Sequence, residues 1–140
     1  LALYAMKHIT EDGHALAKYL LMHDATEVYV GDIVYHLKTE FPTFIELENK
    51  IAEQIAIAFN LPELSEEVQA RAKYLDRAVC FDEMYILFGQ VDPWYFENKV
   101  QPLGLEKLLV SSEDKFGWTP EEAKTKFLTV ALTLGIIDKD

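Results

Sequence analysis

Helical spacing of the apolar residues is the feature that most constrains the fold of this 140-residue chain. Apolar side chains recur every three or four residues in nearly every segment, and no convincing alternation of apolar and polar residues indicates a strand. Breaks at Gly31, Pro42, Pro62 and Gly89 divide the pattern into separate helices. We therefore expect an all-α fold, with residues 1–140 forming a single helical domain.

The turn and capping residues predict where the helices begin and end. Helices are expected over residues 1–9, 14–30, 43–60, 65–88, 103–116 and 120–134, with a short helical or irregular segment at 32–38 and an irregular one at 91–102. Gly31 is a suitable left-handed cap, while Thr43 and Ser65 are suitable N-caps. Thr119 to Glu122 has the form of a capping box. The apolar run before His23 predicts that helix 14–30 is largely buried.

Composition and charge exclude several classes of protein. A hydrophobic content of 50% suits one globular core, and no run of about 18 uncharged apolar residues predicts a membrane span. Cys80 is the only cysteine, which excludes an internal disulfide and fits a cytoplasmic protein. The net charge of −11 argues against a nucleic-acid partner, because the phosphate backbone attracts basic surfaces.

Ionisable residues interrupt apolar faces at two places. His23 and Asp24 end the run Leu20-Leu21-Met22, and Glu27 lies within one helical turn of both. Asp76 interrupts the apolar face of helix 65–88, and Glu83 follows two turns later. Buried ionisable groups need compensation, for which a metal ion is a common solution. The alternatives are a hydrogen-bonded core histidine beside a local cap, an ion pair at Asp76 and a solvated Glu83.

Several motifs occur together in an order typical of one family. These are His23-Asp24-Ala25-Thr26-Glu27 with Gly31-Asp32 and Lys38 after it, Asn60-Leu61-Pro62, Ala72 to Asp76 with Glu83 after it, and Trp118 to Ala123 with Phe127 after it. The set resembles the HD-domain metal-dependent phosphohydrolases, in the branch similar to bacterial and phage 5′-deoxynucleotidases. The likeness covers nearly the whole chain, and it implies an HD-type helical bundle.

The resemblance implies a role for each residue of the site. His23, Asp24 and Asp76 would hold a divalent metal ion: Mn²⁺, Co²⁺, Fe²⁺ or Mg²⁺, with zinc as the alternative. Glu27 would act as general base or acid on the water or the leaving oxygen, and Asp32 is the second candidate. Lys38 would bind the substrate phosphate. An exposed lysine that ends a short helix is the other interpretation of Lys38.

One departure from the family concerns its first metal-ligating histidine. In the family this histidine lies just ahead of a segment like Leu1 to Tyr4, so we expect it, and a phosphate-binding arginine, to precede residue 1. We therefore also expect weak metal occupancy in this fragment. His14 is too far from His23 to replace it, at about 13 Å along a helix. His8 lies in a different register and is expected to be a surface histidine.

These features predict a phosphohydrolase that cleaves the phosphate monoester of a small-molecule nucleotide, a deoxynucleoside 5′-monophosphate by preference. Hydrolysis of a nucleoside polyphosphate or pyrophosphate is the alternative within enzymes. A non-catalytic HD module that binds a nucleotide or a partner is the alternative outside them, although such a module needs no base beside the metal. We expect neither a membrane nor a nucleic acid as partner, and a homodimer is compatible with the sequence.

Overall fold

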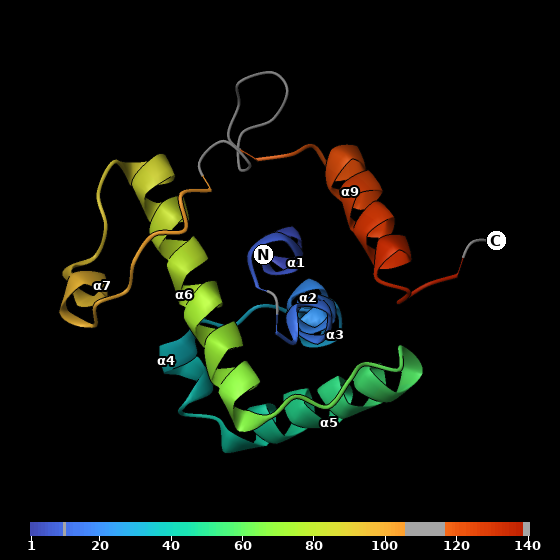
Figure 1. Cartoon of the computed structure of the whole chain (residues 1–140). Helices are drawn as coiled ribbons and strands as arrows, with labels where there is room; N and C mark the ends of the chain where they lie inside the picture. Colours follow the sequence, from blue (N-terminus) through green and yellow to red (C-terminus); the bar gives the residue numbers. More distant parts are fainter. Residues whose placement is uncertain (10, 106–116, 139–140) are drawn as a thin grey trace. The chain divides into compact units, whose positions relative to one another are not determined.

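The computed structural model describes residues 1–9, 11–105 and 117–138. Every regular element in these residues is a helix (Figure 1), which confirms the all-α fold. No helix within these ranges is long and apolar enough to cross a membrane. The contacts divide between two compact units, one of Leu1 with residues 64–130 and one of residues 2–63 with residues 131–140. The single domain therefore stays a prediction.

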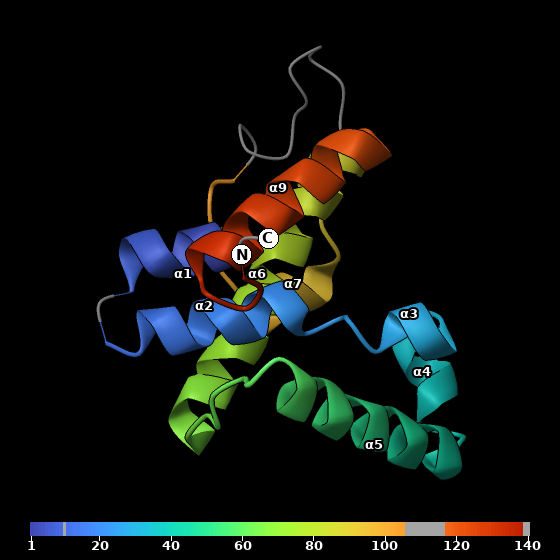
Figure 2. The same ribbon diagram turned by 90° about the vertical axis from the view of Figure 1, so that its right-hand side faces the viewer.

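Helices α1 (Ala2–His8) and α2 (Gly13–Met22) lie side by side (Figure 2). Small residues permit this close approach. Two of them, Ala5 and Ala17, are completely buried. A β-carbon at Gly13 would lie 3.2 Å from the carbonyl oxygen of Ala5. This distance is shorter than most carbon–oxygen contacts, so glycine at position 13 suits the contact between the two helices.

The helix predicted over residues 14–30 is interrupted, so this prediction is wrong as a continuous element. α2 ends at Met22, and α3 covers only Glu27–Val30. Between them the backbone forms turns, in which Ala25 N–H donates to the Met22 carbonyl and Glu27 N–H donates to the Asp24 carbonyl, both over 3.0 Å. Bonds of this three-residue type are tighter than those of an α-helix, so they interrupt the α-helical ladder.

Burial also differs on the two sides of this interruption. Five residues of α2 are buried, as predicted, whereas none of α3 is. Gly31 ends α3, as expected, and its N–H donates to the Glu27 carbonyl. Its φ of 77° needs glycine, but its ψ of 165° is extended rather than left-handed helical.

The next two helices are α4 (Tyr35–Lys38) and α5 (Pro42–Ala58), which are in contact. The predicted cap at Thr43 is wrong, because α5 begins one residue earlier, with Phe41 at the N-cap and Pro42 at the first helical position. Proline is favoured there because its missing N–H would have no helical partner. Only Ile55 of α5 is buried.

The longest helix, α6 (Glu66–Phe88), has the boundaries that its caps predict. The hydroxyl of Ser65 accepts from Val68 N–H at 3.4 Å, and Gly89 ends the helix in the left-handed conformation. A short helix, α7 (Pro93–Glu97), occupies part of the segment expected to be irregular. Its first turn is capped by Asp92, which accepts from Trp94 N–H at 2.8 Å.

Aromatic contacts join α7 to α6, beside which it lies in Figure 1. The ring of Phe81 meets those of Tyr95 and Phe96 edge to face, with centroids 5.9 and 5.5 Å apart. Arg77 lies over the ring of Trp94 at 5.6 Å. This geometry is favourable because the positive ring edge, or a cation, meets the negative face of another ring.

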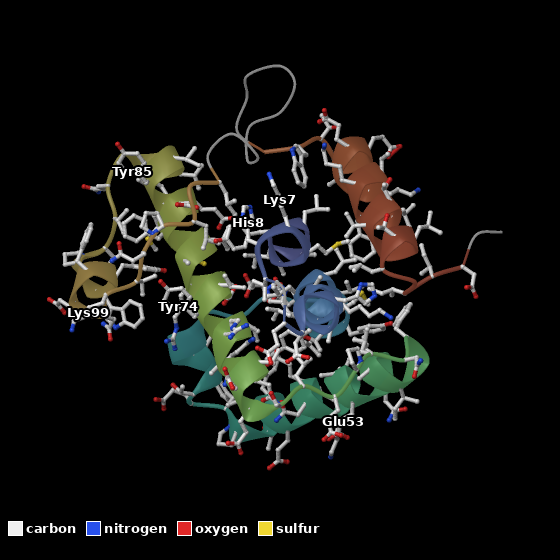
Figure 3. The ribbon with its side chains drawn as sticks, in the orientation of Figure 1. Lys7, His8, Glu53, Tyr74, Tyr85 and Lys99 are labelled. Atoms are coloured by element: carbon white, nitrogen blue, oxygen red, sulfur yellow. The ribbon has the colours of Figure 1, made fainter. Side chains whose placement is uncertain are left out.

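Asp82 holds the chain that follows α7 against α6. It is only 1% exposed, and its Oδ2 accepts from the N–H groups of Leu103 and Leu105, at 3.1 and 3.0 Å. The hydroxyl of Tyr74, drawn on α6 in Figure 3, accepts from Gln101 N–H at 3.3 Å. One buried carboxylate therefore replaces the hydrogen bonds that this irregular segment cannot make to itself.

The last helix, α9 (Pro120–Thr133), begins with the predicted capping box. Glu122 N–H donates to the Thr119 hydroxyl at 3.2 Å, and Thr119 N–H donates to the Glu122 carboxylate at 2.8 Å. The helix predicted over residues 103–116 lies mostly outside the described residues, and its first part, 103–105, is not helical.

Replacing Asp82 with alanine should destabilise the fold by about 2–4 kcal/mol, because two backbone N–H groups lose their acceptor in a buried setting. Hydrogen exchange should show faster exchange at the amides of Leu103 and Leu105, and urea unfolding should give the loss of stability. Glu67→Ala is the control, because this carboxylate is 85% exposed and its ion pair contributes little. Unchanged exchange at both amides would contradict the role of Asp82.

Candidate functional site

His23 and Asp24 lie where α2 ends, in the turns that precede α3. The Nδ1 atom of His23 is 2.9 Å from the carbonyl oxygen of Leu20. Because a carbonyl can only accept, Nδ1 must carry a proton, which directs Nε2 toward Asp24. The distance from Nε2 to Asp24 Oδ2 is 3.1 Å. The imidazole is thus oriented by the backbone of its own helix.

This pair fits the chemistry of two metal ligands. Bonds of about 2.0–2.2 Å from nitrogen and oxygen to one ion place the two ligand atoms about 3.0–3.4 Å apart. A ligating histidine also commonly donates its other N–H to a backbone carbonyl, as His23 does to Leu20. An imidazolium–carboxylate ion pair has the same geometry. The pair therefore suits a cation without requiring one.

Three or more donor side chains are not arranged for a metal ion anywhere in the described residues. Asp76, the third predicted ligand, lies on α6, and so belongs to a different unit from His23 and Asp24. Its convergence with them stays a prediction. His8 and His14 are at the surface. His8, labelled in Figure 3, is exposed, and its ring stacks on that of Tyr4 with centroids 4.6 Å apart; His14 is also exposed.

Glu27, the first residue of α3, is half-buried among other charges. Burial raises the pKa of the Glu27 carboxyl above its usual range, and the charges of Asp24 and Asp32 raise it further. The positive charge of Lys38 opposes these effects, and the charge of Glu48 adds to them. The predicted base, its predicted alternative and the predicted phosphate cation thus lie close enough to influence one another.

Lys38 makes an ion pair that the sequence analysis did not predict. Its Nζ lies 2.7 Å from Oε1 of Glu48 on α5, and the two side chains are only 21% and 19% exposed. The ammonium also lies 5.9 Å from the centroid of the Phe44 ring, one helical turn before Glu48. The hydrogen bond to Glu48 raises the pKa of Lys38, and burial opposes that increase. An exposed, unattached lysine is therefore the wrong description of Lys38.

The second predicted carboxylate of α6, Glu83, is half-buried rather than fully solvated. Burial is the main cause that raises the pKa of the Glu83 carboxyl, and the negative charge of Asp76 raises it further. The amino group of Leu1 opposes this shift, and Asp82 adds to it. The charge of Asp76 therefore acts on the Glu83 carboxyl, two turns further along α6.

A shallow groove of about 420 Å³ runs along α5. Its walls are mainly apolar, with Tyr29, Ile51, Ile55 and Phe59 among the lining residues. None of the predicted site residues lines it. The groove therefore does not mark the predicted site.

Comparisons of the chain with models of protein families, with curated proteins and with solved structures found no match.

Glu48 and Asp82 were not predicted from the sequence, although each leaves a signal in it. Glu48 follows Phe44 by one turn, so a carboxylate stands on the apolar side of its helix. Asp82 follows Ala78 by four residues and continues the buried stripe of α6, where a charge needs a partner. A carboxylate at an apolar position of a helix is thus a signal of a long-range contact.

Replacing Glu83 with glutamine should stabilise the fold at neutral pH. The folded state raises the pKa of this carboxyl, so the unfolded chain releases the proton at a lower pH than the folded chain does. The stability of the unmodified protein therefore falls as the pH rises from the pKa of the unfolded chain to that of the folded chain. Below about pH 4 the carboxyl is protonated in both states, so the advantage of the variant should disappear. Urea unfolding at several pH values measures this difference.

The same change at Glu67, an exposed carboxylate on the same helix, is the control and should alter stability little at any pH. A Glu83→Gln variant without added stability at neutral pH, or with the same gain at all pH values, would contradict the prediction.

Proposed function

We propose that this chain is a metal-dependent phosphohydrolase that cleaves the phosphate monoester of a nucleotide, by preference a deoxynucleoside 5′-monophosphate. One observation carries the proposal: the charges of Asp32 and Lys38 act on the Glu27 carboxyl, in the turns and short helices that follow the His23–Asp24 pair. A potential base, a potential phosphate cation and two potential metal ligands are thus provided by one short stretch of chain. The order of the motifs in the sequence supports the same class.

His23 and Asp24 are the proposed metal ligands of this stretch, and the resemblance assigns a third to Asp76. The bound divalent ion would lower the pKa of a water molecule and neutralise charge on the phosphoryl group. A cation also suits this site for an electrostatic reason. The negative charges of Asp24, Asp32 and Glu48 act on Glu27, and Lys38 opposes them, so an anionic substrate needs additional positive charge.

Glu27 is proposed to exchange a proton with the water or with the leaving oxygen. Its half-buried carboxyl has a raised pKa, which makes it a better base than an exposed glutamate. Asp32 is the second candidate, because its charge also acts on Glu27. Lys38 is proposed to bind the phosphate, since its ammonium has three donors and Glu48 occupies one.

The central test replaces Glu27 with glutamine, which keeps the size of the side chain but removes its proton exchange. Turnover of a deoxynucleoside 5′-monophosphate should fall by about 10²–10⁴-fold, the usual contribution of general acid–base catalysis. Binding of Mn²⁺ or Co²⁺, measured by calorimetry, should persist because the ligands are unchanged. Asp76→Ala should lose metal and activity together.

Each other result would change the assignment. Full activity of Glu27→Gln would transfer the role of base to Asp32, and loss of metal with activity would make Glu27 a ligand or a support for one. If the intact protein released no phosphate from any nucleotide with Mn²⁺, Co²⁺, Fe²⁺, Mg²⁺ or Zn²⁺, the proposed activity would be wrong. Nucleotide binding without turnover would then favour the non-catalytic module.

A further inference from the structure

The ion pair between α4 and α5 has a consequence for Lys38. α4 is only four residues long and lies between irregular segments. A helix this short has little stability of its own, so a lysine at its end is not held in place by local structure. α5, in contrast, is 17 residues long and has a regular backbone. An interaction with α5 can therefore give Lys38 an order that α4 cannot.

Two side chains of α5 provide this interaction. Glu48 accepts a hydrogen bond from the ammonium at 2.7 Å, and the Phe44 ring lies 5.9 Å from it. Positions 44 and 48 are one turn apart and face the same side of the helix. Both members of the ion pair are about four-fifths buried, so water weakens their attraction less than at an exposed site.

We propose that Glu48 is a positioning residue, which anchors the ammonium of Lys38 on α5 and keeps it beside Glu27 and Asp32, where it meets the phosphate of the substrate. This inference rests on the proposed function, because only a phosphate substrate gives Lys38 a ligand there. Glu48 itself does not touch the substrate. It accepts one of the three ammonium hydrogens and leaves two for phosphate oxygens.

The ion pair between Glu48 and Lys38 affects the binding of substrate more than the hydrolysis step. A free lysine must give up much of its side-chain freedom when it binds phosphate, whereas a lysine already held by Glu48 has lost it beforehand. Glu48 also supplies a negative charge that weakens the net attraction for an anion. We expect order to be the larger effect, because Glu27 and Asp32 also act on Lys38 and leave the surroundings negative when the charge of Glu48 is removed.

Glu48→Gln tests this inference, because it removes the charge and retains the size of the side chain. The KM for a deoxynucleoside 5′-monophosphate should rise by about tenfold, the usual effect of losing one ordered long side chain, while kcat changes less than about twofold. Glu48→Asp keeps the charge and should recover part of the loss. Glu53→Gln is the matched control, because Glu53 is an exposed glutamate on the same helix (Figure 3).

A second measurement does not depend on activity. In the unmodified chain, side-chain NMR should show an ordered Lys38 ammonium with a pKa above the usual range, and the signal should move when inorganic phosphate is added. In Glu48→Gln the pKa should fall toward the usual range, and phosphate affinity should fall by about tenfold. Glu53→Gln should behave as the unmodified chain does.

The two measurements separate the two proposals. If no nucleotide is hydrolysed but the NMR changes occur as described, the proposed activity is wrong and the anchoring of Lys38 by Glu48 is supported. A disordered Lys38 ammonium in the unmodified chain would overturn the inference without any variant. An equal KM and equal phosphate affinity in Glu48→Gln and Glu53→Gln would also overturn it.

Discussion

The interruption between α2 and α3 is the constraint on which the candidate site depends. In a continuous helix, the side chains of His23 and Asp24 would project from the helix surface, with Glu27 one turn further along. Instead the chain turns after Met22, and the Leu20 carbonyl near the end of α2 accepts from His23. Helix ends leave such carbonyls without a helical donor, and here the histidine side chain provides one. The same bond orients the ring toward Asp24.

Electrostatics then restricts what this stretch can bind. Glu27 is near three other carboxylates and one lysine, so this stretch is strongly negative, as is the whole chain. A nucleotide phosphate can approach such a site only if a cation lowers the repulsion. The proposed metal ion and Lys38 have this role in common. Their positions differ, because the ion would be held by side chains of the α2–α3 turn and Lys38 is held by α5.

The parts of the candidate site that could be predicted are those that are close in sequence. His23, Asp24, Glu27 and Asp32 span ten residues, so their grouping follows from their order in the chain. Glu48 could not be assigned to Lys38, because ten residues and a change of direction separate them. Asp76 is further away in sequence, and it belongs to the other compact unit. No local rule states which distant side chains meet.

The sequence by itself determined the helical class and most helix ends. Ser65, Gly89 and the Thr119 capping box act through bonds within a few residues, so their effect can be derived from the order of the residues. Only the tertiary structure decided which groups bind to the buried and half-buried carboxylates. Asp82 accepts from Leu103 and Leu105 across more than twenty residues, and Glu48 accepts from Lys38. Such pairs form where two segments pack together and exclude water from the groups between them, and this packing is a property of the folded chain.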